Sequence, residues 1–348
     1  MFLLFCICLI SATNFVFCHD KVIYTYYDVR LVNTDKTTVM NCNKNNIYKF
    51  ITSSRQLPVK NHFTFYNCYL TENFNITKLF DSLKIKVKRL TFDDSDFYIK
   101  NLHGLEDITH LSIKAFRGTL YSDILHQFPN LQVFHLEGHA FYYIPMNFFG
   151  YSDKLKTFDI AESSIKKLRK RDFNGLTNLS LLKLRVGRGM DPAELIIEDG
   201  AFENLTSLKS LDITLSILKK APLELFKNLK NLETFRISCK DSTKMIISLP
   251  EKLFTNQKSL KTLNIEAIGS NQLPNNVFEN LETLENLRIS EYEGDALPRE
   301  IFNNTRNIKV LQITNNNLEF LPSNIFKNLK KLEILDLSYN KFGTLPPM

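Results

Sequence analysis

The sequence predicts an α/β repeat solenoid in which short parallel strands form one concave sheet. The clearest observation is the segment 308–348, where one apolar pattern occurs twice with an offset of 24 residues. In the first copy, Leu311 and Ile313 are two residues apart, so they point to the same face of a strand. Asn316 follows at a turn, where its amide can bond backbone groups that lack a sheet partner. Because one such unit cannot bury its apolar edge alone, we expect the units to stack.

The same pattern recurs along most of the chain, which is the second observation. The eleven predicted strand starts are Val87, Ile108, Leu131, Leu155, Leu179, Leu208, Leu232, Leu260, Leu284, Ile308 and Leu332. A phenylalanine precedes the next strand start by six residues at Phe149, Phe173, Phe202, Phe226, Phe254, Phe278, Phe302 and Phe326. This is the leucine-rich repeat pattern, and it predicts a horseshoe. We expect an N-terminal cap over residues 19–86 and about 11 repeats over residues 87–348.

The two ends of the chain carry further expectations. Residues 1–18 contain an apolar run and no charged residue, which is typical of a secretory signal peptide. An uncleaved membrane anchor fits less well, because the run is shorter than the about 20 apolar residues of a membrane span and Asn14 interrupts it. At the other end, Met348 follows a Leu-Pro pair with no C-terminal cap. We therefore expect either a longer protein or an edge that pairs with another molecule.

Charge and cysteine content narrow the class of protein. The 348 residues carry a formal net charge of +7, and the two signs interleave, which predicts a well-solvated surface and no nucleic-acid groove. Of six cysteines, Cys42, Cys68 and Cys239 remain after the predicted signal peptide. In a secreted protein, Cys42 and Cys68 are expected to pair and close the cap. Cys239 is then odd, and is either a buried free thiol or a bond to another chain.

Candidate ligand-facing residues lie at the fifth position of the repeats. They are His135, Asp159, Lys183, Asp212, Arg236 and Arg288. From Asp159 to Arg236 the charge alternates in sign between neighbours, and opposite charges on adjacent strands attract. Two interpretations follow: a ladder in which the charges satisfy one another, or a charged platform for a protein ligand.

Two long intervals and one basic run complete the candidate contact regions. The interval of 29 residues contains Arg188 and Asp191, and the interval of 28 residues contains Lys240 and Asp241. Insertions on a solenoid form loops that either bind ligands or have drifted on the surface. The basic run 166–171 is interpreted as a solvated loop, with polyanion binding or proteolytic cleavage as alternatives.

Modification and catalysis can be judged from motifs. Four N-glycosylation sequons occur, at Asn75, Asn178, Asn204 and Asn303, and the last three fall outside the predicted concave sheet. His135 and Glu137 share a face but lack the further ligands of a zinc site, so we expect no metal and no cofactor. With no catalytic motif found, we expect the chain not to be an enzyme.

The cap and the middle repeats carry a more specific resemblance. The cap contains Met40-Asn41-Cys42-Asn43, then Leu57-Pro58, then Asn67-Cys68-Tyr69-Leu70. A long seventh repeat contains the segment 248–257, and the next repeat has Leu273-Pro274 and Phe278 in matching register. In these features the chain resembles the N-terminal part of an insect Toll receptor ectodomain.

The resemblance implies a receptor that binds a cystine-knot cytokine of the Spätzle type through the cap and early repeats. It further implies an extracellular location, a homodimer, and innate immune or developmental signalling. This chain departs from the family in having no C-terminal cysteine cap, transmembrane helix or signalling domain, so membrane attachment would need a further part. No individual contact residue is transferred. The alternative hypothesis is a soluble secreted recognition factor that acts through a partner bonded to Cys239.

Overall fold

The structure is a computed structural model that falls into two compact units, each described by itself. Unit 1 comprises Met1–Thr119 and Asp123–Gly138, and unit 2 comprises Leu120–Ser122 and His139–Met348. The described residues are 14–18, 21–26, 29–33, 37–42, 46–47, 61–116, 120–138, 142–186, 195–215, 225–239, 249–266 and 273–343. Most of the predicted signal peptide therefore lies outside the described residues.

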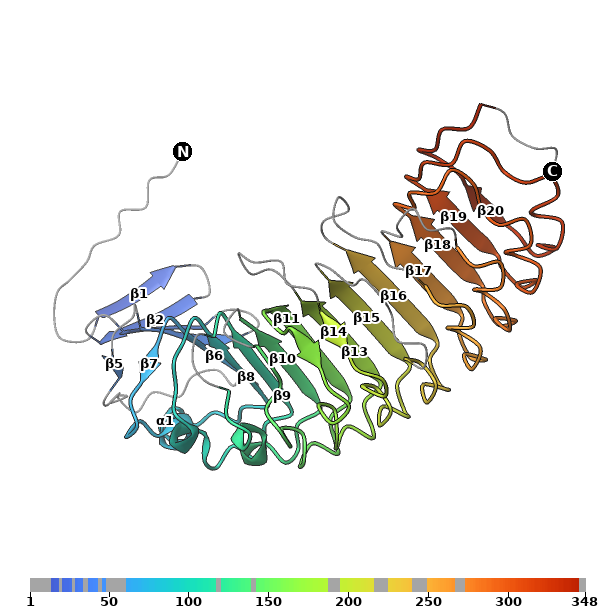
Figure 1. The fold of residues 1–348 in the computed structure, drawn as a ribbon. Helices are drawn as coiled ribbons and strands as arrows, with labels where there is room; N and C mark the ends of the chain where they lie inside the picture. The colour runs from blue at the N-terminus through green and yellow to red at the C-terminus, as the bar shows by residue number, and fades with distance from the viewer. Residues whose placement is uncertain are drawn as a thin grey trace, which may run out of the picture. The chain divides into compact units, whose positions relative to one another are not determined.

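Unit 1 contains one sheet whose described strands follow the order β1-β2-β3-β4-β6-β8-β9-β10 (Figure 1). Their bounds are Asn14–Cys18 (β1), Lys21–Tyr26 (β2), Val29–Asn33 (β3), Thr38–Asn41 (β4), His62–Tyr66 (β6), Arg89–Asp93 (β8), His110–Lys114 (β9) and Val133–Glu137 (β10). The pairs from β1 to β4 are antiparallel, whereas those from β4 to β10 are parallel. The parallel stack thus includes β4 and β6, which precede the first predicted strand start.

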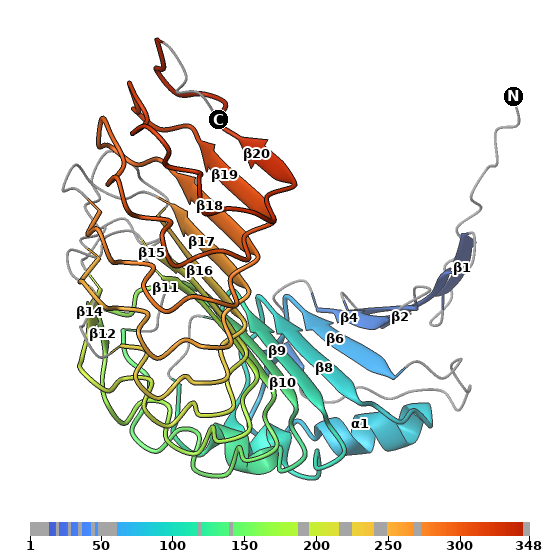
Figure 2. The same ribbon diagram turned by 90° about the vertical axis from the view of Figure 1, so that its right-hand side faces the viewer.

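The N-terminal part of unit 1 is closed by the predicted disulfide. Cys42 and Cys68 are bonded, with their Cα atoms 4.8 Å apart, and both are buried. Two short strands, Asn46–Ile47 (β5) and Tyr69–Leu70 (β7), pair beside the disulfide. The helix Ile76–Leu83 (α1) lies on the side of the connecting loops (Figure 2) and buries its apolar face. Two 3-10 helices, Ile99–Leu102 (η1) and Ile124–Gln127 (η2), serve the later connections.

Unit 2 continues the repeat pattern with parallel strands in the order β11-β13-β15-β16-β17-β18-β19-β20. Their bounds are Thr157–Ser163 (β11), Leu181–Val186 (β13), Ser210–Leu215 (β15), Thr234–Cys239 (β16), Thr262–Glu266 (β17), Asn286–Ser290 (β18), Val310–Thr314 (β19) and Ile334–Asp336 (β20). A second small sheet pairs Lys167–Leu168 (β12) with Ile196–Ile197 (β14). Each predicted strand start lies two residues before a strand, so the leucine-rich repeat solenoid with a parallel sheet is confirmed.

The core of unit 2 has the two predicted apolar layers. Strand residues such as Leu211 and Ile213 are fully buried on one face of the sheet. Seven of the eight predicted phenylalanines are also buried, and Phe326 is half-buried. The rings stack along the repeats, with centroid distances of 5.6 Å between Phe226 and Phe254 and 6.3 Å between Phe302 and Phe326. Because such ring contacts join neighbouring repeats, they hold the units by neighbour-to-neighbour packing.

The turns after the strands are bonded through different side chains in different repeats. Asn316 accepts a hydrogen bond from the Tyr292 backbone N–H and donates to the Ile289 carbonyl. Ser95 fills the same position in an early repeat, where its Oγ accepts from the Cys68 N–H and donates to the Phe65 carbonyl. A serine can therefore replace the turn asparagine, because it also supplies one donor and one acceptor.

The residue before this turn has a positive φ in seven of the described repeats. The seven are Asn67, Asp94, Ala115, Glu162, Glu291, Asn315 and Tyr339. This left-handed conformation is uncommon for residues other than glycine, asparagine and aspartate.

Within the described ranges, no helix is long and apolar enough to cross a bilayer.

Candidate ligand-binding face

The sheet of unit 2 presents the predicted charged residues in one column on its outer face. Asp159 pairs in register with Lys183, Lys183 with Asp212, and Asp212 with Arg236. The column continues through Asn264, Arg288, Gln312 and Asp336. Because side chains alternate between faces along a strand, the flanking buried leucines fix this column on the opposite face from the core.

One interaction within this column differs from the predicted ladder. Asp159 was expected to be satisfied by its neighbour Lys183, but its carboxylate accepts two hydrogen bonds from Arg185 Nη2, at 2.8 and 2.7 Å. Arg185 lies on β13, two residues after Lys183, and its longer side chain reaches back across the strand gap. The Nε atom of Arg185 is buried and has no hydrogen-bond partner in the described part of the chain.

Asp212 is a partly buried carboxylate in the middle of the column. Burial raises its pKa, and the nearby cations Arg236, Lys183 and Arg185 oppose that rise. Its Oδ1 atom is buried without a hydrogen-bond partner among the described residues. An unsatisfied buried acceptor costs free energy in the folded state.

His135 lies in the sheet of unit 1, in register with Ser112 on β9. Its Nε2 atom is 3.3 Å from Glu137 Oε2, so the two side chains form a hydrogen-bonded pair. His139 lies outside the described residues. A search of the described residues finds no group of three histidine, cysteine or acidic side chains that could hold a metal ion.

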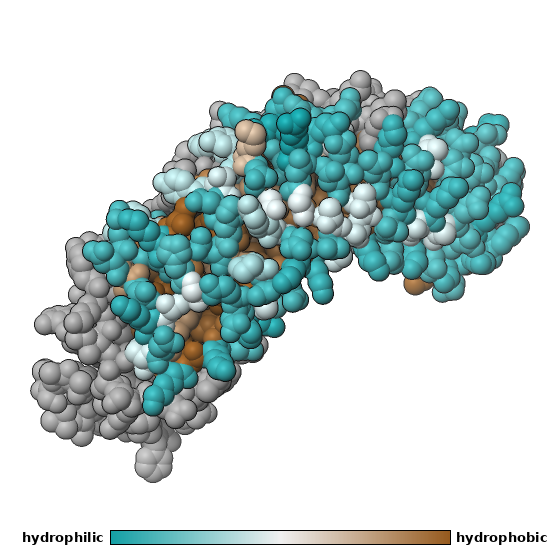
Figure 3. Space-filling view, turned by 90° about the horizontal axis from the view of Figure 1, so that it is seen from below, coloured by the Kyte–Doolittle hydropathy of each residue, from teal (hydrophilic) through white to brown (hydrophobic). Residues whose placement is uncertain are grey.

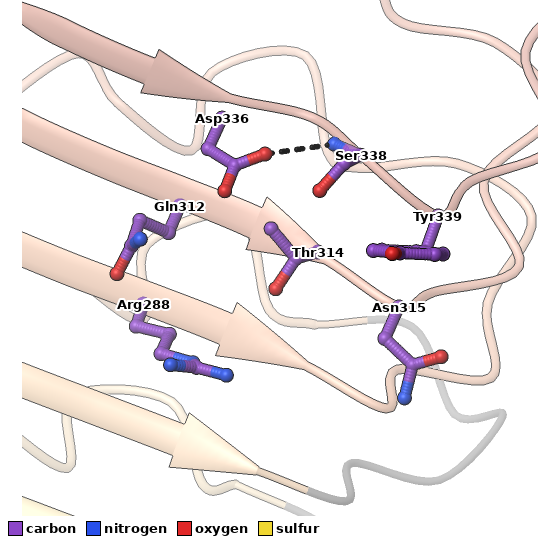
Figure 4. A pocket seen from close by; sticks show the side chains of 7 residues that line it. All are labelled: Arg288, Gln312, Thr314, Asn315, Asp336, Ser338 and Tyr339. Carbon is purple, nitrogen blue, oxygen red and sulfur yellow. Dashed lines mark hydrogen bonds between the residues drawn. The ribbon is translucent and has the colours of Figure 1, made fainter.

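An open pocket of about 430 Å³ lies over the last described strands. It is lined by Arg288, Gln312, Thr314, Asn315, Asp336, Ser338 and Tyr339. Figure 4 shows Arg288, Gln312 and Asp336 side by side across three strands, with Tyr339 beyond the strand ends. The Tyr339 ring is 82% exposed, and the Ser338 backbone N–H donates to Asp336 Oδ1 at 3.0 Å. The hydrogen bonds from Ser338 and the charge of Arg288 lower the pKa of Asp336.

An exposed aromatic segment was missed by sequence reasoning. Residues 142–151 present Tyr142, Tyr143, Met146 and Tyr151, each more than half exposed. Because these residues follow no repeat position, only the structure shows that they remain outside the core. The face drawn in Figure 3 is mostly hydrophilic, with hydrophobic patches among the polar side chains. Tyrosine is a residue type that often anchors protein partners.

Three of the five cations in the basic run 166–171 pair with local carboxylates. Lys167 is 2.7 Å from Glu198, Lys170 is 3.2 Å from Glu203, and Arg169 bonds Asp172. These pairs reduce the charge that the run offers to a polyanion. Burial raises the pKa of Asp172, while hydrogen bonds from Arg169 oppose that rise.

Five candidate residues lie wholly or partly outside the described residues. The insertion residues Arg188, Asp191, Lys240 and Asp241 lie outside the described residues. Cys239 ends β16, and its side chain is likewise outside the described part. Their predicted roles remain predictions.

The sequons lie away from the outer face of the sheet. Asn75 caps α1, its Oδ1 accepting from the Lys78 backbone N–H. Asn178 is exposed, and its amide donates to the Asp153 carbonyl. Asn204 and Asn303 are half-buried and bond asparagines of neighbouring repeats. Glycosylation at all four remains a prediction.

Comparisons with known proteins agree with this architecture. Residues 306–347 match the family described as leucine rich repeat, and residues 142–266 match the BspA type leucine rich repeat region. No curated protein sequence matches the chain. Among solved structures, the Toll–Spatzle complex of Drosophila aligns with a TM-score of 0.72 and 20% identity, over 95% of this chain and 48% of that chain. A TLR13–ssRNA13 complex aligns with a TM-score of 0.55 and 18% identity, over 81% and 51% of the two chains.

These comparisons define the class of the molecule. The chain carries leucine-rich repeats and shares its fold with the Toll chain of the Toll–Spatzle complex. It spans about half the length of the solved chains that it matches. At this level of identity the likeness concerns the fold.

Proposed function

We propose that this chain binds a protein ligand outside the cell, as a Toll-like ectodomain in innate immune or developmental signalling. The observation that carries the proposal is the outer face of the parallel sheet. Charged side chains stand there in register, and an open pocket lies over β18 to β20. Such a preorganised polar face suits a folded partner, because little ordering is lost on binding.

The ligand proposed is a cystine-knot cytokine of the Spätzle type. The fold supports this choice, since a structure of similar architecture is described as a complex of Toll with Spatzle. An extracellular location is supported by the buried Cys42–Cys68 disulfide, because disulfides persist in oxidising compartments. A homodimer formed with the ligand is part of the same proposal.

The test is surface plasmon resonance of the full chain against a recombinant Spätzle-type cystine-knot protein. Arg288→Glu reverses an exposed charge beside the pocket, whereas Arg306→Glu reverses one on a connecting segment and serves as the matched control. We expect Arg288→Glu to weaken binding by about tenfold or more, and the control to leave it unchanged. Absence of binding by the wild type would reject this ligand. Equal effects of both variants would reject this face.

Light scattering of the same mixture tests the homodimer. Two copies of the chain per bound ligand are expected, and a complex with only one copy would reject the dimer.

A further inference from the structure

A basic row crosses the outer face of the unit 1 sheet. His62 on β6 is in register with Arg89 on β8, and Arg89 is in register with His110 on β9. The residues that follow each of them in the chain are Phe63, Leu90 and Leu111, which are buried. Since side chains alternate, the three basic side chains share the outer face and stand on a packed core. We call His62, Arg89 and His110 the basic row.

A row of hydroxyl groups lies directly beside the basic row. Thr64, Thr91 and Ser112 are in register on the same three strands, two residues further along. The Nε2 atom of His62 and the Oγ1 atom of Thr91 are 2.9 Å apart and share a hydrogen bond between the rows. Ser112 Oγ is buried with no hydrogen-bond partner in the described part of the chain. Because Ser112 Oγ is enclosed, the cationic groups of the basic row are the groups that this place offers to a ligand.

Among the described residues, the basic row forms no ion pair with a carboxylate. Arg89 is exposed and, among the described residues, forms no ion pair or side-chain hydrogen bond. Asp93 and Lys114 face each other on β8 and β9, four residues beyond the row. On the far side of β9, the pair His135 and Glu137 satisfies itself. The charge of Arg89 is therefore available to an incoming anion.

This environment lowers the pKa values of the two histidines. Burial lowers the pKa of His62, and the cations Arg89, Lys114 and His110 lower it further. Burial and the charge of Arg89 likewise lower the pKa of His110. Near neutral pH both imidazoles are therefore largely uncharged, and the row carries mainly the Arg89 charge. A bound anion would reverse the repulsion and favour protonation of both rings.

We propose that the basic row binds acidic side chains of the protein ligand. This deepens the proposed function and rests on it, because it names the chemistry by which the ligand is recognised. The guanidinium of Arg89 can bond one carboxylate through two parallel N–H groups, while the imidazoles bond its neighbours. With strands about 4.8 Å apart, the row spans roughly 10 Å, which matches acidic side chains on a segment that crosses the strands.

The experiment uses the full chain with a poly-glutamate peptide as the probe. Binding is followed by isothermal titration calorimetry at about pH 7.5 and about pH 5.5, between which histidines titrate while glutamates stay ionised. We expect tighter binding at the lower pH, because protonation of His62 and His110 adds positive charge. Arg89→Ala should weaken binding by about tenfold, and added salt should weaken it further. Arg306→Ala removes an equally exposed arginine outside the row and should change nothing.

A second measurement follows the histidines directly. Proton NMR of the imidazole C2–H signals should show the pKa values of His62 and His110 rising when the peptide is added. The double variant His62→Gln and His110→Gln should abolish the pH dependence and keep the binding due to Arg89. Circular dichroism of each variant checks that the fold is retained.

The outcomes separate this inference from the proposed function. Unchanged peptide binding in Arg89→Ala, or unmoved histidine pKa values, would overturn it even if a cytokine binds elsewhere on the chain. Binding of heparin through the row without binding of poly-glutamate would also overturn it, in favour of sulfate esters. Failure of the chain to bind a cystine-knot protein would reject that ligand but leave the peptide result standing.

Discussion

The turn residue Asn316 offers the sharpest test of how one repeat supports the next. Asn316→Ala removes a side-chain amide that is buried between two repeats. Its Oδ1 accepts from the Tyr292 backbone N–H at 2.8 Å, and its Nδ2 donates to the Ile289 carbonyl at 3.3 Å. Loss of the first bond leaves a buried donor unsatisfied, which costs about 1–3 kcal/mol, and loss of the longer bond adds about 1 kcal/mol. We expect the free energy of unfolding to fall by about 2–4 kcal/mol.

The matched control is Asn317→Ala, one residue further along the chain. Asn317 is exposed and its side chain makes no hydrogen bond within the described residues, so its loss should cost little. Urea unfolding followed by circular dichroism compares the two variants. Because solenoids can unfold in parts, hydrogen exchange at the Tyr292 amide supplies a local measurement, and it should accelerate only in Asn316→Ala. If the two variants differ by less than about 0.5 kcal/mol, the account of this turn is wrong.

Three further predictions address the core, a close contact and a titrating group. Leu311→Ala should lower the free energy of unfolding by about 2–5 kcal/mol in urea titrations, and a loss below roughly 0.5 kcal/mol would reject the strand register. Gly294→Ala would place a Cβ about 2.2 Å from the buried Tyr292 ring, so we expect a loss of about 1–3 kcal/mol, and this loss should shrink in a Tyr292→Asn background. Asp212→Asn should stabilise the chain near neutral pH: burial raises the pKa of Asp212 in the folded state, so its ionisation opposes folding above that pKa. The gain should vanish below about pH 4 in urea midpoints measured across pH, and a gain that persists there would contradict the burial argument.

The repeat register could be predicted because it depends on a few buried positions. Every strand requires two buried apolar residues, such as Leu211 and Ile213 on β15, so the repeat period is visible in the sequence. The column from Asp159 to Arg236 follows from that period. The disulfide between Cys42 and Cys68 could be predicted from the few cysteines of the chain and from the expected secretion of the protein. Each of these features rests on residues whose type is dictated by burial or covalent chemistry.

The features that sequence reasoning missed depend on positions where several residue types fit the fold. Strand β6 escaped notice because Phe63 and Phe65 replace the usual aliphatic pair and the following connection is a helix. The partner of Asp159 proved to be Arg185, a choice set by side-chain reach that spacing does not reveal. The basic row was also missed, since candidate residues were chosen only from the fifth position of each repeat, whereas His62, Arg89 and His110 precede it by two residues.

The buried positions of each strand are fixed by packing, whereas the outward-facing positions accept many residue types. One fold can therefore present different chemistry along its length. The buried residues of each strand hold neighbouring strands in register, so any side chain placed between them is presented at a defined height and spacing. In unit 1 these positions carry Arg89 between two histidines, with no carboxylate paired to them among the described residues, whereas in unit 2 Asp159 and Arg185 neutralise each other. An acidic partner should therefore gain more from the unit 1 row than from the Asp159–Arg185 pair, because Arg89 forms no ion pair in the described part of the chain.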